Sequence, residues 1–83
     1  MSFHAEIIIT LKEGVLDTAG KAVSLSLRHL GHQGIRELRI GRVVHVNLDI
    51  PEEKAARATV ETMCSDLLVN DLIEEYRYTL EKI

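Results

Sequence analysis

One stretch of the chain, residues 43–50, alternates apolar and polar side chains, with Val43 as the one exception. Every second position is a branched apolar residue: Val44, Val46, Leu48 and Ile50. A period of two places these side chains on one face of an extended chain and predicts a half-buried β-strand. A similar alternation over residues 3–11 predicts another strand, with Ile8 as the exception on its outer face. The fold must therefore include a β-sheet.

Between these two strands, the sequence predicts a helix. Gly14 breaks the first strand, and Asp17 or Thr18 can cap the helix that follows, which runs to about His29. Its apolar stripe has the spacing of a 3.6-residue period, and we expect this stripe to lie on the sheet: Ala19, Val23, Leu27 and Leu30. Gly31 suits the left-handed position that ends the helix.

Three further elements complete the expected secondary structure. A strand is expected at about residues 35–40, with Gly41 and Arg42 as the break before the strand at 43–50. Pro51 opens a second helix that stops near Asn70. Its expected buried stripe is Ala56, Val60 or Thr59, Met63 and Leu67. A last strand covers about residues 74–82.

The order strand, helix, strand, strand, helix, strand is the split ferredoxin-like α+β plan. We therefore expect a two-layer sandwich, in which an antiparallel four-stranded sheet carries two helices on one face. No linker or low-complexity segment divides the chain, so residues 1–83 are expected to form a single domain.

Composition narrows the possible partners. The chain of 83 residues has no Trp, one Phe and two Tyr, so its core must be aliphatic and small, and such cores often gain stability by association. We expect an oligomer. A net charge of -3 argues against nucleic acid. A single cysteine, the lack of a long apolar run and the lack of a secretory leader favour a cytoplasmic protein without a membrane partner.

The residues that could carry chemistry do not form a convincing set. His29 and His32 are separated by Gly31, and His4 and His45 lie on different strands, whereas a catalytic zinc needs three converging ligands. Cys64 falls late in a helix, where the dipole disfavours a thiolate. The sequence also lacks a phosphate-binding loop. No catalytic, cofactor-binding or metal-binding residue is predicted.

Several short motifs, in order and spread over nearly the whole chain, resemble a known family. They are KEGVLDTAG at residues 12–20 followed by Ala22-Val23, Leu30-Gly31, RIGR at 39–42, Met63-Cys64, and LLVNDLIEEY at 67–76. Together they resemble the PurS family, the small subunit of phosphoribosylformylglycinamidine synthase. The chain departs from the family's usual proline at Thr18, its alanine-asparagine-proline at residues 69–71 and its aromatic residue near His32.

The resemblance implies a subunit of an ATP- and glutamine-dependent ligase in the fourth step of purine biosynthesis. In this family a glutaminase subunit releases ammonia, and a synthetase subunit uses ATP to activate formylglycinamide ribonucleotide. A PurS-type homodimer or tetramer joins the two. ATP, Mg and glutamine are thus used by the complex, and this chain is expected to hold no cofactor of its own.

The motifs also supply the residues expected to contact partner subunits. These are Gly14, Leu16, Asp17, Gly20, Arg39, Gly41, Arg42, Asn70, Asp71 and Tyr76. The same residues can equally be read as turn formers, helix caps and loop ties. Two other functions remain open at this point: a small-ligand-binding regulatory module of the ACT type, which shares the element order, and a small enzyme of the acylphosphatase type, which would need an anion-binding loop that is missing here.

Overall fold

The computed structural model describes residues 2–83. The elements in chain order are β1 (Phe3–Leu11), α1 (Thr18–His29), β2 (Arg42–Leu48), α2 (Glu53–Met63), a π-helical turn η1 (Cys64–Leu68) and β3 (Glu74–Lys82). The three strands and α1 were expected from the sequence at nearly these bounds. The second helix was expected to continue to near Asn70, but α2 ends at Met63 and the π-helical turn η1 follows it.

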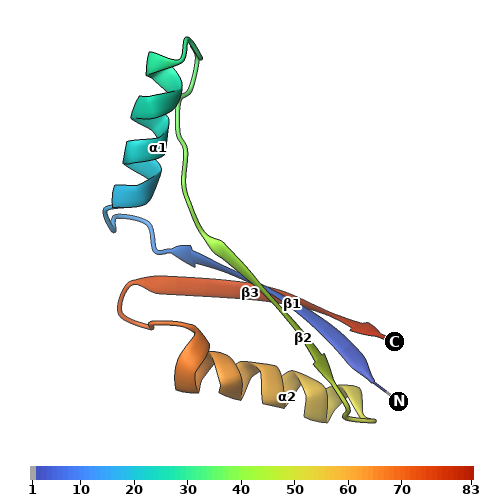
Figure 1. Ribbon diagram of the computed structural model, residues 1–83. Helices are drawn as coiled ribbons and strands as arrows, with labels where there is room; N and C mark the ends of the chain where they lie inside the picture. Colours follow the sequence, from blue (N-terminus) through green and yellow to red (C-terminus); the bar gives the residue numbers. More distant parts are fainter. Residues whose placement is uncertain (1) are drawn as a thin grey trace.

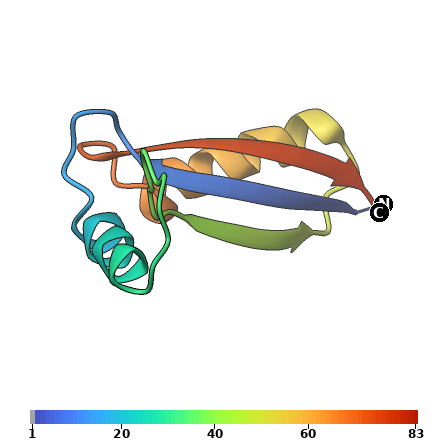
Figure 2. The ribbon, with the colours of Figure 1, turned by 90° about the horizontal axis from the view of Figure 1, so that it is seen from above.

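The three strands form one antiparallel sheet in the order β2-β1-β3 (Figure 2). The central strand β1 pairs along its length with both neighbours, so that Ile7 lies opposite Val44 on one side and Tyr78 on the other. Side chains alternate across β1 as its sequence predicts, with Phe3, Ala5, Ile7 and Ile9 buried. Strands β2 and β3 are the two edges.

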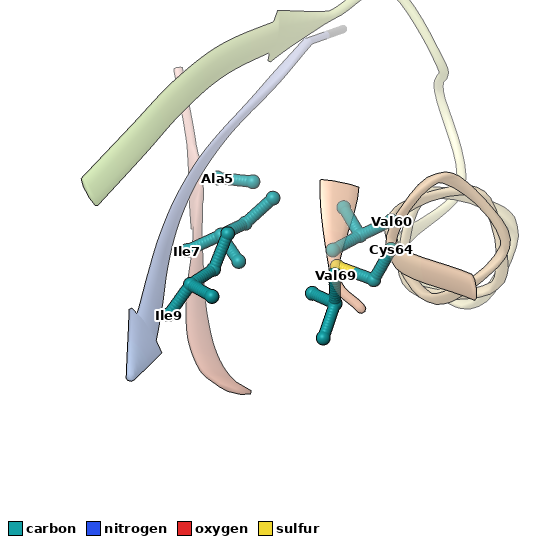
Figure 3. Packing of buried hydrophobic residues seen from close by; sticks show 6 residues of the cluster. All are labelled: Ala5, Ile7, Ile9, Val60, Cys64 and Val69. Carbon is teal, nitrogen blue, oxygen red and sulfur yellow. The ribbon is translucent and has the colours of Figure 1, made fainter. Parts of the chain in front are cut away.

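Helix α2 covers the buried face of the sheet and closes a small aliphatic core. Val60 and Cys64, both fully buried, face Ile7 and Ile9 of β1, and Val69 fills the end of the cluster (Figure 3). Burying an aliphatic side chain of this size contributes about 1.5–3 kcal/mol relative to leaving it exposed. A core with so few members leaves the domain with little stability to spare.

The four-stranded sheet expected from the sequence is wrong. Residues 35–40 are extended, as their alternation predicts, but they pair with no strand of the described chain. Instead they run straight into β2 (Figure 1), because the chain does not turn back at Gly41 and Arg42. Alternation fixes an extended conformation, whereas pairing depends on a turn that this local sequence does not enforce. The fold is still α+β, with three strands.

The expectation that both helices lie on one face of the sheet is also wrong. Helix α1 and the returning segment project together from the sheet (Figure 1), and we call residues 18–41 the arm. Only Gly20 of α1 is buried, while Val23 and Leu30 of the expected stripe are 40% and 76% exposed. The chain measures 50 × 27 × 15 Å, and its radius of gyration is 16.4 Å, against about 12 Å for a compact domain of this length.

The end of α2 departs from the expected buried stripe. Ala56, Val60 and Cys64 are buried, whereas Leu67, expected in the core, is 84% exposed. The π-helical turn η1 explains the change, because its wider spacing breaks the 3.6-residue period after Met63. Cys64 therefore takes the core position, which confirms its expected role as a packing residue.

Candidate partner-binding surface

The residues expected to contact a partner gather where three segments of chain meet at one end of the sheet. There β1 ends, the arm leaves and returns, and β3 begins (Figure 1). A backbone hydrogen bond of 2.8 Å from the amide of Lys12 to the carbonyl of Ile73 joins two of these segments. We call this region, residues 11–20, 38–42 and 68–76, the sheet end.

Asp17 holds the base of the arm together. Its Oδ1 accepts a hydrogen bond of 2.8 Å from the amide of Gly20 and so caps α1, as the sequence predicts. Its Oδ2 accepts one of 2.7 Å from the amide of Ile40 on the returning segment. The hydrogen bonds from Ile40 and Gly20, aided by the charge of Arg39, lower the pKa of the Asp17 carboxyl.

Two glycines are required here by close approach of the backbone. A Cβ atom at Gly20 would meet the Asp17 carboxylate and lie 2.9 Å from the carbonyl oxygen of Leu38. A Cβ atom at Gly41 would lie 2.6 Å from the carbonyl oxygen of Ile9. Both distances are shorter than real contacts of a Cβ atom. Gly20 therefore lets α1 lie close to the returning segment, and Gly41 lets the arm pass close to β1.

Two arginines tie the loops to the sheet. Arg39 Nη2 donates to the carbonyl of Leu11, at 2.7 Å, where β1 ends. Arg42 Nη2 donates at 2.8 Å both to the carbonyl of Leu68 and to Oε1 of Glu74. The hydrogen bond that the amide of Asn70 donates to Glu74, together with Arg42, lowers the pKa of the Glu74 carboxyl against a smaller opposing effect of burial.

Asn70 and Asp71 shape the turn before β3. The side-chain Oδ1 of Asn70 accepts a hydrogen bond of 3.1 Å from the amide of Leu72, a local turn typical of asparagine. The backbone carbonyl of Asp71 accepts one of 2.6 Å from Lys12 Nζ. These contacts use the backbone of Asp71 and leave its carboxylate for other interactions.

The remaining expected residues differ in exposure. Gly14 has a φ of +87° in the turn after β1, and Leu16 beside it is 66% exposed. Tyr76 is half-buried on the α2 face and stacks on Tyr78, with ring centroids 6.3 Å apart. Burial is the main cause of its raised pKa. Tyr76 therefore belongs with the core, and Leu16 with the surface.

The structure thus brings the expected residues together and gives most of them internal contacts. Seven of them form ties, caps or close approaches within the chain: Asp17, Gly20, Arg39, Gly41, Arg42, Asn70 and Asp71. The sequence reasoning missed two exposed apolar residues beside them, Leu67 and Leu72. A regular 3.6-residue period continued from Ala56 and Val60 would place Leu67 in the buried stripe, so only the π-helical turn, which local sequence patterns do not reveal, puts it outside.

The side chains that could react chemically either lie away from the sheet end or are in an unreactive form. Burial raises the pKa of the Cys64 thiol, which disfavours a thiolate nucleophile. His4 and His45 stack on the open face of the sheet with centroids 5.3 Å apart, and His4 Nδ1 donates to Oδ1 of Asn47 at 2.5 Å. Among residues 2–83, no three potential ligands are grouped to bind a metal ion.

Within residues 2–83, both helices are too short or too polar to span a bilayer.

Comparison with known proteins decides the family. The family model described as PurS, phosphoribosylformylglycinamidine (FGAM) synthase, matches residues 4–82. A relative from Synechocystis, phosphoribosylformylglycinamidine synthase subunit PurS, is 40% identical over 79 residues, covering 95% of this chain and 79% of the relative. The chain belongs to the PurS family. PurS is a subunit of FGAM synthase in purine biosynthesis, so the resemblance seen in the motifs is confirmed and the ACT-type alternative is set aside.

Solved PurS structures share the fold of this chain. The crystal structure of Methanocaldococcus jannaschii PurS, described as one of the subunits of formylglycinamide ribonucleotide amidotransferase, is 32% identical, with a TM-score of 0.87 over 98% of both chains. A chain of the PurLQS structure from Thermotoga maritima is 26% identical, with a TM-score of 0.90 over 98% of this chain and 99% of that one.

The departures from the usual PurS sequence leave the local structure intact. Thr18 is the first residue of α1, where proline would also fit, and Asp17 still caps the helix. At Asp71 the turn is closed by a hydrogen bond of 3.1 Å from the amide of Ile73 to the carbonyl of Asn70. A missing proline changes stability by only about 0.4–1 kcal/mol, so these turns persist without it.

Proposed function

We propose that this chain is the non-catalytic, homodimeric bridging subunit of FGAM synthase. It would join the glutaminase and synthetase subunits, so that ammonia released from glutamine reaches formylglycinamide ribonucleotide activated with ATP and Mg. Membership of the PurS family and the likeness to a chain of the Thermotoga PurLQS structure support this proposal. The ten sheet-end residues named from the sequence would shape the surface that meets the partners.

The observation that carries the proposal is the arm. A helix with one buried residue gains little from its own sheet, and most helical stability in proteins comes from packing an apolar face. Leu25 and Leu30 are 56% and 76% exposed along it. Between α1 and residues 36–38 lies an open groove of about 490 Å³, lined by both apolar and basic side chains. Such an element is stable when another chain covers it.

A second copy of this chain supplies what each copy lacks. The sequence predicts a strand at residues 35–40, and among residues 2–83 the outer edge of β2 is unpaired. The arm of a second copy can add this strand and lay its α1 over the half-exposed Val44, Val46 and Leu48. Exchange of an identical element between copies is a low-cost route to a dimer.

Charge favours the same arrangement. The arm, residues 18–41, contains four basic residues and one acidic residue, whereas the rest of the chain contains six basic and twelve acidic residues. The basic arm of one copy is therefore attracted to the acidic remainder of another copy.

A bridging role accounts for a subunit without a catalytic group. Ammonia is mostly protonated in water at neutral pH and then is no nucleophile, so a closed route that excludes water protects its reactivity. Forming such a route requires surfaces that hold the two enzymes in a fixed relative position.

Co-purification with the glutaminase and synthetase subunits tests the proposal, followed by a glutamine-dependent assay with and without this chain. We expect the chain to be recovered with both subunits and the glutamine-dependent rate to fall when it is omitted, while the rate with added ammonium salt persists. Full glutamine-dependent activity in its absence would rule out the bridging role.

A further inference from the structure

Two histidines that are 41 residues apart in sequence meet on the open face of the sheet. His4 lies on the central strand β1 and His45 on the edge strand β2. The register places Asn47 directly opposite His4, so His45, two residues before Asn47, is its diagonal neighbour on the same face. His4 Nε2 lies 3.2 Å from His45 Nδ1. The sequence puts these histidines on different strands, and strand pairing brings their imidazoles into contact.

The hydrogen bonds of this pair determine which nitrogen of His4 is free. Asn47 Oδ1 is an acceptor, so the 2.5 Å bond between it and His4 Nδ1 requires the proton of His4 to lie on Nδ1. In the neutral ring, His4 Nε2 then keeps its lone pair, which accepts a hydrogen bond from His45 Nδ1. Histidines that bind metals are arranged in the same way, because a hydrogen bond from the second nitrogen sets the tautomer and orients the ring. His4 Nε2 is therefore prepared as a ligand.

The separation of the two nitrogens suits a single metal ion. Zinc binds imidazole nitrogens at about 2.0–2.1 Å, and two such ligands at a tetrahedral angle lie about 3.3–3.4 Å apart. The 3.2 Å between His4 Nε2 and His45 Nδ1 is close to this separation. To bind the ion, His45 gives the proton on Nδ1 to water and takes one on Nε2, so the ring stays neutral. His45 is exposed, so its ring can turn to direct the freed lone pair at the ion.

The charges beside the pair favour a cation. Glu6 lies directly opposite His45, and Glu81 lies directly opposite His4 on the other neighbouring strand, β3. The basic side chain on this face of β3, Arg77, is four residues before Glu81 along the strand. Carboxylates next to a site raise the local concentration of cations. The surroundings of the two histidines are therefore more favourable to a divalent ion than the far end of this face.

We infer that His4 Nε2 and His45 Nδ1 together bind one divalent transition-metal ion that prefers imidazole, represented by Zn²⁺. Residues 2–83 group no third protein ligand with the pair, so water molecules complete the coordination. The ion joins the central strand to the edge strand β2 and stabilises the folded chain by mass action. Mg²⁺ does not fit, because it prefers oxygen ligands. The site does not depend on the bridging role.

Calorimetric titration of the full chain, without a histidine tag, with ZnCl₂ tests the site. We expect one ion per chain, and affinity at least about tenfold weaker in His4→Ala and in His45→Gln, since loss of even an outer-shell partner commonly costs that much. The control carries His29→Ala and His32→Ala, which removes the other two histidines, and it should bind as wild type does. MgCl₂ should give no binding. The melting temperature of each variant without metal checks that it is folded.

Two readouts distinguish coordination from a structural effect of the substitutions. Nitrogen NMR of the imidazoles should show the proton of His45 moving from Nδ1 to Nε2 when ZnCl₂ is added, with the signals of His29 and His32 unchanged. Asn47→Ala should weaken Zn²⁺ binding by about 10–100-fold, because Asn47 orients a ligand without touching the ion. Asn47→Asp keeps the acceptor and should bind at least as tightly as wild type.

A wild-type chain that does not bind ZnCl₂ would overturn the inference. So would wild-type affinity in His4→Ala or His45→Gln, or a loss of binding in the control that lacks His29 and His32. Unchanged affinity in Asn47→Ala would overturn the orienting role of Asn47.

Discussion

Asp17 connects two points of the chain that are 23 residues apart in sequence. One carboxylate oxygen caps α1 and the other accepts from the amide of Ile40, so a single side chain closes the base of the arm. Gly20 and Gly41 allow the backbones to approach at the same place. A cap can be anticipated from the spacing of Asp17 and Gly20, whereas the bond to Ile40 depends on the path of the arm.

Replacing Asp17 tests whether the arm is fixed at its base. In Asp17→Ala, we expect faster hydrogen exchange at the amides of Gly20 and Ile40 and a lower melting temperature, because both amides lose their acceptor. The control is Glu13→Ala, a change at an exposed acidic residue in the neighbouring turn. Unchanged exchange at Ile40 would show that the carboxylate does not hold the arm.

The lowered pKa values of Asp17 and Glu74 predict how stability depends on pH. Both carboxyls favour the charged form more when folded than when unfolded, where their pKa values are about 3.9 and 4.3. Their contribution is therefore complete above these values and is lost as the pH falls through the lower folded values. Denaturant titrations from neutral pH to about pH 3 should show this loss, and Asp17→Asn with Glu74→Gln should reduce it. An equal loss in the double variant would contradict the assignment.

At the scale of elements, α2 and β1 form the core, and the π-helical turn decides which side chains join it. The period of α2 places Val60 and Cys64 against the sheet, and η1 then turns Leu67 outward. The stability of the domain thus depends on very few side chains.

A pair of truncations distinguishes the two sides of this helix. Val60→Ala should lower the free energy of unfolding by about 2 kcal/mol, because it leaves a cavity in a fully buried position. Leu67→Ala should change it by less than about 0.5 kcal/mol, since that side chain is exposed. Denaturant unfolding at a fixed protein concentration measures both. Equal effects would mean that the helix is packed with a different face.

The secondary structure of this chain is largely predictable from its sequence, and the pairing of its elements is not. Alternation over residues 3–11 and 43–50 identifies strands because each buries one face. The same signal at Leu38 and Ile40 correctly indicates an extended segment, but which strand it pairs with depends on distant residues and on whether the chain turns at Gly41. Likewise, the stripe of α1 is real but is not used within one copy. The sheet-end residues could be found only through the family motifs.

At the scale of the whole molecule, the arm and the rest of the chain differ in charge, and each leaves apolar surface or a strand edge without a partner. The arm has an exposed apolar surface that covers no sheet. The sheet has an edge that pairs with no fourth strand and a face that carries no second helix. In the proposed dimer, two copies that exchange arms would satisfy both needs at once.

Charge reversal on the arm tests this exchange. Arg28 and Arg36 line the groove of the arm, and Arg28→Glu with Arg36→Glu should weaken self-association at low salt by at least about tenfold, with a smaller difference at high salt. The control is Lys54→Glu, which reverses a charge on α2 outside the arm. Sedimentation equilibrium measures both. If the arm variant associates as tightly as wild type, the arm does not join the copies.

The extended shape of the chain has a consequence for reach. A radius of gyration of 16.4 Å is that of a compact domain of roughly 200 residues, yet this chain has 83. Because the arm projects from the sheet and does not pack on it, the protein has a larger span. A globular chain would need more than twice as many residues to reach the same span. For the bridging role proposed above, this span would let a short chain reach two partner proteins at once.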